Sequence, residues 1–194
     1  MTEQQPYQTV TTYDAFELRR YPAHLLAEVT IDGSFEDAGN RAFRYLFGYI
    51  SGDNRSRTTV SMTSPVVQTG DGTSIAMTAP VVQQAQTDSR YRVAFVLPST
   101  LTMDTAPEPT STQVHLREVP ESVTAALRFG GRWTEASYHR HLGQLRTAIT
   151  DAGLTAAGSP RFARFDPPFT PWFLRRNEVM LDVESPAGNA KDQT

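Results

Sequence analysis

A short phrase that occurs twice constrains the fold of this chain more than any other stretch. Residues 61–68 read SMTSPVVQ and residues 76–83 read AMTAPVVQ, fifteen positions later. The intervening TGDGT is typical of a tight turn, so the two copies are predicted to be the arms of a β-hairpin. A turn centred on Asp71 places Met62 and Met77 on opposite faces, because strand side chains alternate, unless a bulge at a proline shifts the register.

The proline of each copy is expected to act through the backbone. Proline cannot donate a hydrogen bond to a neighbouring strand, so it is found at sheet edges and at bulges. Each copy is therefore predicted to mark such a place in the sheet. The two methionines are expected to serve packing more than binding, because one ligand could not touch both faces.

Composition excludes several classes of function. The chain of 194 residues has no cysteine, which rules out disulfides, thiolate catalysis and thiolate-bound metals. Its net charge is −3 and its arginines are scattered, so nucleic acid is not expected as a partner. No apolar run approaches the roughly 20 residues of a membrane span, and the first residues do not resemble a secretory signal. We expect a cytoplasmic protein with no membrane partner.

The length and the lack of an internal linker predict one folded domain over residues 11–183. Residues 1–10 and 184–194 are polar, have no apolar period and are expected to be loose tails. Besides the hairpin, apolar alternation predicts strands at residues 13–21, 24–31, 90–97, 113–119, 122–129, 160–165 and 177–183.

A first helix is predicted to begin after Ser34, its N-cap, and to end near residue 50. On a helical wheel its core stripe consists of Phe35, Ala38, Gly39, Ala42, Leu46 and Tyr49. Phe43 and Phe47 lie one turn apart on a flank of this helix, beside Asn40 and with Arg44 further round. Two neighbouring aromatic rings at the edge of a core are more than packing requires.

A second helix is predicted over residues 134–151, with the core stripe Tyr138, Leu142, Leu145 and Ile149. The residues at its start, 131–136, echo residues 33–38 at an offset of 98. The echo is either accidental or the trace of an internal duplication. A duplication predicts an α+β fold of two strand–helix–strand–strand units, in which an antiparallel sheet carries both helices.

Four short motifs follow one another along the chain: YP at 21–22, AMTAPV at 76–81, FDPP at 165–168 and RRNEV at 175–179. Together they resemble the SOUL haem-binding protein family, over about residues 13–183. The resemblance implies a distorted antiparallel β-barrel of two pseudo-symmetric βαββ repeats with two main helices, related to gyrase-inhibitor and effector-binding modules. It also implies non-covalent binding of haem or another tetrapyrrole in an apolar groove between the first helix and a late loop.

On this sequence the resemblance places the groove at two sets of residues, which are Asn40, Phe43, Arg44 and Phe47 on the first helix and Trp172, Phe173, Arg175 and Arg176 in the late loop. Aromatic rings suit the tetrapyrrole and arginines suit its propionates. Two other interpretations stay open. The rings would instead form a minor core, and one of the two late arginines would instead pair with Glu178 to fix the last strand.

Haem iron calls for an axial ligand in many proteins, and four histidines are available. Members of the family that use an axial histidine carry it just before the YP-like pair, where this chain has Arg20. His24 follows that pair closely and is the candidate iron ligand, although a histidine at a strand edge usually has a structural role. His139 and His141 lie about 160° apart around their helix and cannot share a metal.

Catalytic signatures are lacking. The sequence contains no Gly-rich phosphate loop, nucleophile elbow or HExxH motif, and Glu17, Glu118 and Glu178 show no visible partner. We therefore expect a protein that is not an enzyme and that carries, buffers or senses a tetrapyrrole. The alternative is a small-molecule effector-binding or protein-partner module of the gyrase-inhibitor type, in which one buried glutamate would meet a cationic ligand.

Overall fold

The structure is a computed structural model that describes residues 3–56, 72–87, 89–166 and 170–184. The chain divides into two compact units, which we describe in turn. Unit 1 is Met1–Gln5 with Ala23–Pro120, and unit 2 is Pro6–Pro22 with Glu121–Thr194. The first copy of the repeated phrase and residues 185–194 of the expected C-terminal tail lie outside the described residues. No helix in the described part is both long enough and apolar enough to cross a membrane.

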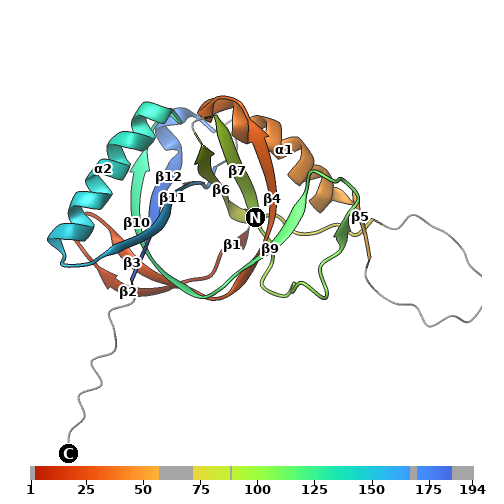
Figure 1. The fold of residues 1–194 in the computed structure, drawn as a ribbon, viewed down its shortest axis with the longest axis horizontal. Helices are drawn as coiled ribbons and strands as arrows, with labels where there is room; N and C mark the ends of the chain where they lie inside the picture. The colour runs from red at the N-terminus through yellow and green to blue at the C-terminus, as the bar shows by residue number, and fades with distance from the viewer. Residues whose placement is uncertain (1–2, 57–71, 88, 167–169, 185–194) are drawn as a thin grey trace, which may run out of the picture. The chain divides into compact units, whose positions relative to one another are not determined.

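Unit 1 is an antiparallel sheet covered by one helix. Its strands follow one another in the order β6 (Thr78–Thr87), β7 (Arg90–Val96), β4 (His24–Asp32) and β9 (His115–Val119). A short strand, β1 (Glu3–Gln4), runs parallel to the start of β6. Helix α1 (Phe35–Ser51) packs against β4 and β7 (Figure 1). Strands β5 (Asn54–Arg55) and β8 (Glu108–Pro109) form a separate ribbon.

Helix α1 begins and ends as its sequence predicts. The Ser34 side chain accepts a hydrogen bond from the Asp37 N–H, and Gly52 ends the helix with a φ of 125°. All six residues of the predicted core stripe are buried, together with Ile50. The predicted helix and its buried face are therefore confirmed.

Unit 2 is built in the same way. Its antiparallel strands follow the order β2 (Gln8–Thr12), β3 (Glu17–Tyr21), β10 (Ser122–Gly130), β12 (Arg176–Val183) and β11 (Ala156–Arg164). Helix α2 (Glu135–Asp151) packs against β10, β11 and β12 (Figure 1). The Thr134 side chain caps it by accepting the Ser137 N–H, and the four residues of the predicted stripe are buried.

The two units repeat one topology. In unit 1 a strand, β4, leads into α1 and is followed by β6 and β7, with β7 hydrogen-bonded between β4 and β6. In unit 2, β10 leads into α2 and is followed by β11 and β12, with β12 between β10 and β11. Both helices have 17 residues. The predicted pair of βαββ repeats is confirmed.

The amino-terminal region differs most from prediction. Residues 13–21 were expected to be one strand, but only Glu17–Tyr21 is a strand, and Tyr13 turns back by donating its N–H to the Phe16 carbonyl at 2.9 Å. Strands β1 and β2 also lie partly or wholly in residues 1–10, where a loose tail was expected. Every residue of β2 is exposed, so no apolar alternation marked it in the sequence.

The second copy of the repeated phrase forms the start of β6. The register of β6 on β7 shifts between Thr78 and Val81, so the irregularity falls at Pro80. This confirms the prediction that the proline of this copy marks an irregularity in the sheet. Gln83, the last residue of the copy, is buried and donates its side-chain amide to the Phe35 carbonyl at 2.9 Å. The phrase therefore ties the sheet of unit 1 to the first turn of α1.

Candidate functional site

The exposed flank of α1 carries a pair of stacked rings. Phe43 and Phe47 lie 5.5 Å apart, centroid to centroid, with an angle of 14° between their planes. Phe43 also contacts the buried Phe95 of β7 edge to face, at 5.6 Å. Phe43 is 38% exposed and Phe47 48%, so one side of the pair rests on the core and the rest faces outward. This confirms that the two rings lie off the buried stripe.

Polar residues flank this ring pair on the same helix. Asn40 and Arg44 are both exposed, and they lie within one helical turn of Phe43 or Phe47. An amide and a guanidinium can each bind a carboxylate, the guanidinium through two parallel hydrogen bonds. The flank thus combines a flat apolar surface with candidate anion-binding groups.

The late segment of the expected groove belongs to unit 2. Trp172 and Phe173 lie on a short 3-10 helix, η1 (Trp172–Leu174), with their rings edge to face at 5.7 Å. They are 50% and 63% exposed. Neither ring is part of a buried minor core. The residues of the expected groove belong to both units.

The two late arginines have different surroundings. Arg176 pairs with Glu178, with 2.7 Å between Nη2 and Oε1, which confirms the interpretation that one of them fixes the last strand. Arg175 donates its Nε–H to the Thr170 carbonyl at 2.7 Å. Arg176 is thus held by Glu178, whereas the Arg175 guanidinium holds the loop backbone at Thr170.

Glu178 is the centre of a buried ionic network that was not predicted. Its carboxylate is fully buried and accepts two hydrogen bonds from the Arg19 guanidinium, at 2.7 and 3.2 Å, in addition to the Arg176 contact. Arg19 also binds Glu17, at 2.7 Å, and donates to the Tyr21 hydroxyl oxygen at 3.2 Å. Glu17 and Glu178, which showed no visible catalytic partner in the sequence, are therefore both paired with arginine.

The reason that this network was not predicted is the distance along the chain. Arg19 and Glu178 are 159 positions apart and meet because β3 and β12 both flank β10. A hint in the sequence was that Glu178 directly precedes the apolar run Val179–Leu181 of the last strand, since a buried charge is nearly always paired. Two arginines and two glutamates make the network neutral overall. Both Glu178 oxygens are occupied, so this acid has no vacant oxygen for a cationic ligand.

The network shifts the pKa of two groups. Burial alone would lower the pKa of the Arg19 guanidinium, but its hydrogen bonds to Glu178 and the charge of that acid raise it further above its ordinary value. Burial raises the pKa of the Tyr21 hydroxyl, and the hydrogen bond from Arg19 opposes this only in part. Arg19 is thus charged, and Tyr21 neutral, at any physiological pH.

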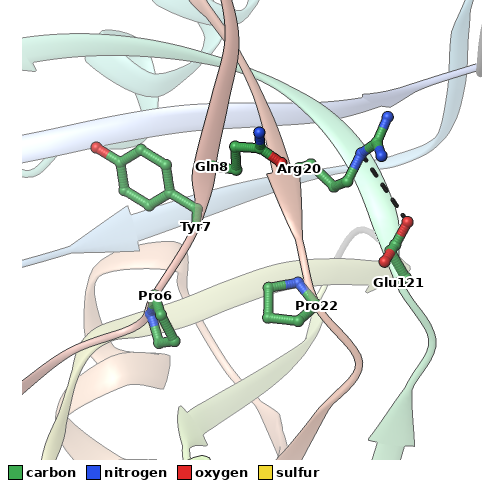
Figure 2. Close-up of a pocket in the computed structure, with 6 residues that line it drawn as sticks. All are labelled: Pro6, Tyr7, Gln8, Arg20, Pro22 and Glu121. Carbon is green, nitrogen blue, oxygen red and sulfur yellow. Dashed lines mark ion pairs between the residues drawn. The ribbon is translucent and has the colours of Figure 1, made fainter.

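A shallow cleft lies at the surface beside this network, within unit 2. The volume of the cleft is about 300 Å³. Figure 2 shows the residues that line it, which are Pro6, Tyr7, Gln8, Arg20, Pro22 and Glu121. Arg20 is the residue that stands where the resemblance puts an axial histidine. Its Nε lies 3.9 Å from Glu121, both side chains being about half exposed or more, so this ion pair is loose. Tyr7 also lines the cleft, and the Arg19 guanidinium lies over its ring, 4.4 Å from the ring centre.

The histidines are placed mostly as structural residues. His24 is the first residue of β4, is half-buried and lies opposite Val119 of β9. His139 is exposed near Glu135, and His141 stacks on Phe129 while its Nδ1 hydrogen-bonds the Ser137 carbonyl at 2.7 Å. In the described part of the chain, no three acidic or histidine side chains are grouped to hold a metal ion.

Comparison with known proteins gives a consistent family. The model of the family described as SOUL heme-binding protein matches residues 2–182. Heme-binding protein 1 of Xenopus tropicalis is 30% identical over 167 residues, which cover 85% of this chain and 82% of that protein. The protein of the same name from Xenopus laevis is 29% identical over 170 residues, with the same coverage.

Solved structures show the same fold at much lower identity. The C-terminal domain of EcmrR aligns with a TM-score of 0.60 and 10% identity, over 92% of this chain and 98% of that one. A hydrolase from Listeria innocua aligns with a TM-score of 0.54, also at 10% identity, over 94% of each chain. These neighbours have the gyrase-inhibitor-like effector-binding fold, as predicted. At such identities the likeness concerns the fold alone.

Proposed function

The chain belongs to the SOUL heme-binding protein family, and on that premise we propose that it binds haem or a related tetrapyrrole non-covalently. The observation that carries the proposal, beside the family match, is the stacked and exposed pair Phe43 and Phe47 on α1. The protein acts as a carrier, buffer or sensor, and it does no chemistry on the ligand.

The geometry of the ring pair supports this ligand class. A tetrapyrrole is a flat, largely apolar ring, and stacking on aromatic faces is favourable beyond the area that it buries. Phe95 supports Phe43 from the core side, so the pair is held by packing before any ligand arrives. Because the apolar surface is already ordered, binding loses little side-chain entropy there.

The propionates need cationic or amide partners. Arg44 and Asn40 are exposed beside the ring pair and are proposed for this role. In unit 2, Trp172, Phe173 and Arg175 are proposed as further ligand contacts, as the resemblance implies. Arg176 is the weakest member of the set, because Glu178 already binds its guanidinium. His24 remains the histidine proposed for the iron.

A titration with hemin tests the function. Purified protein is expected to shift the Soret band and to saturate at about one equivalent per chain, since ligand sites of this kind are few per protein. The hemin recovered after long incubation is expected to be unchanged. Absorbance that rises in proportion to hemin without saturating would contradict the proposal, and a degraded chromophore would contradict the absence of catalysis.

The fold favours a second candidate, an effector-binding module for another small molecule. The TM-score of 0.60 to the EcmrR domain supports a shared architecture. A buried acid could receive a cationic effector in such a module, but here Arg19 and Arg176 already occupy Glu178. A thermal-shift panel of hemin, iron-free porphyrin and lipophilic cations separates the candidates. Stabilisation by the cations alone would favour the second.

A further inference from the structure

The turn that contains Trp172, Phe173 and Leu174 exposes more apolar surface than its surroundings explain. These three consecutive side chains are 50%, 63% and 65% exposed, the highest values among the large apolar residues that the structure describes. In a 3-10 helix three residues complete one turn, so the side chains point in three directions around it. A helical element that is apolar all round is normally buried in a core or in a membrane.

The turn is ordered by its own hydrogen bonds. The Leu174 N–H donates to the Pro171 carbonyl at 2.9 Å, and the Arg175 N–H donates to the Trp172 carbonyl at 3.4 Å. The Arg175 guanidinium holds the Thr170 carbonyl. The N–H groups of Leu174 and Arg175 are thus hydrogen-bonded within the turn, which lowers the cost of bringing this end of it into an apolar medium.

Positive charge lies beside the apolar tip. The exposed Arg132 places its guanidinium 5.5 Å from the centre of the Trp172 ring, and Arg175 follows the turn directly. Arg176 does not count toward this charge because it pairs with Glu178, and the Asp166 carboxylate binds the Arg176 backbone N–H. The chain has a net charge of −3, whereas at this tip Arg132 and Arg175 contribute two positive charges and the Asp166 carboxylate one negative charge.

We propose that the Trp172–Leu174 turn docks on a lipid surface that carries anionic headgroups. Tryptophan is enriched at the membrane interface, and a tip of Trp, Phe and Leu with arginine beside it has the composition of interfacial anchors. Arginines near the surface are drawn to an anionic leaflet. A stable protein interface buries about 800 Å² on each partner, which three side chains on a convex turn do not provide. Trp172, Phe173 and Arg175 are also proposed contacts of the tetrapyrrole, so the docking is tested without added ligand.

Vesicle flotation tests the proposal with the full chain and no added ligand. Vesicles of phosphatidylcholine and phosphatidylserine in equal parts are expected to carry the protein, and vesicles of phosphatidylcholine alone to carry much less. The triple variant Trp172→Ser/Phe173→Ser/Leu174→Ser is expected to bind at least about tenfold more weakly. The control, Val10→Ser/Tyr45→Ser, removes comparably exposed apolar side chains elsewhere and is expected to bind like the unmodified protein.

The contribution of charge is tested by a matched pair of arginines. Arg132→Gln is expected to weaken binding to the mixed vesicles by about fivefold, because one cation near an anionic surface contributes about that much. Arg140→Gln removes an exposed arginine from α2 and is expected to change little. Equal losses in the two variants would overturn the assignment of the charge to this turn.

A spectroscopic readout reports the insertion itself. The chain has two tryptophans, and Trp133→Phe leaves Trp172 as the single one. Trp172 emission is expected to move to shorter wavelength with mixed vesicles and to be quenched by brominated lipid. Unmodified protein that stays unbound to mixed vesicles, or unshifted emission, would overturn the proposal. So would a dimer in solution that the triple variant converts to monomer, since a second copy would then cover the turn.

Discussion

The arginine at position 19 illustrates how much a single buried residue can determine. Arg19→Met leaves the fully buried Glu178 without its main partner, and removing one member of a buried ion pair typically costs about 3–5 kcal/mol. We expect a loss of that size in the free energy of unfolding, measured by urea denaturation. The neighbouring Arg20→Met, whose side chain is half exposed, is expected to cost about 0.5 kcal/mol or less.

A double variant tests whether the loss comes from the pair. With Arg19→Met, the further change Glu178→Gln removes the uncompensated charge and is expected to recover part of the stability. The coupling between the two positions should be at least about 1 kcal/mol. Strictly additive effects of the two substitutions would mean that Arg19 stabilises the protein by packing and not by its charge.

Tyr21 predicts a pH dependence. Its pKa in the folded state is raised above the ordinary value of 10.0, mainly by burial. Below that value the hydroxyl is protonated in both states, so it does not change stability. As the pH rises further, the unfolded chain ionises first and the free energy of unfolding falls, until the folded value is passed. Urea denaturation above pH 10 should therefore show a smaller decline for Tyr21→Phe, and an identical decline would contradict this assignment.

Whether a residue is buried or exposed was predictable where the periodicity of a helix or strand determines it. The wheel of α1 placed Phe43 and Phe47 off the core stripe, and their exposure and stacking agree. Local periodicity could not predict the contact between Arg19 and Glu178. That contact depends on which strands flank β10. Local periodicity carries no information about strand neighbours far apart in the sequence.

At the scale of single elements, the two helices show why capping residues are reliable in a sequence. Ser34 and Thr134 each accept a backbone N–H three residues on, at 3.2 Å. Strand β2 had no such local mark, because its five residues are all exposed and none alternates with a buried one. It is a strand because it pairs with β3, and the pairing of an exposed edge strand leaves no apolar pattern in the sequence.

The Ser34 cap of α1 gives a prediction about the stability of the folded protein. Ser34→Ala is expected to lower the free energy of unfolding by about 1 kcal/mol, whereas Ser34→Gly should cost only a few tenths. Thr134→Ala in α2 is the parallel case. Thermal or urea unfolding measures all three. If the alanine variant of Ser34 were as stable as the unmodified protein, the side-chain cap would contribute nothing.

On the scale of the whole molecule, the repeated topology shows both the success and the limit of sequence reasoning. A weak echo between residues 33–38 and 131–136 predicted two βαββ repeats, and both units show that topology. The expected groove, in contrast, rests on the family resemblance. Its residues come from two distant stretches of the chain, and neither helical nor strand periodicity relates those stretches to one another.

Ligand binding should also be visible as stability of the entire fold. A ligand at 100 times its dissociation constant stabilises the folded state by roughly 2.7 kcal/mol. Hemin or iron-free porphyrin is expected to raise the melting temperature accordingly, in a concentration-dependent way. The comparison between the two ligands reports on the iron: equal stabilisation would mean that axial ligation, by His24 or any other residue, adds little affinity.

The most direct test of tetrapyrrole binding on the flank of α1 compares hemin dissociation constants of two variants. Phe43→Ala/Phe47→Ala removes the ring pair, and we expect a loss of about 2 kcal/mol, or roughly thirtyfold in affinity. The control, Val10→Ala/Tyr45→Ala, removes similarly exposed apolar side chains elsewhere and should bind hemin like the unmodified protein. Unchanged affinity in the Phe43 and Phe47 variant, with its fold intact, would contradict the proposed site.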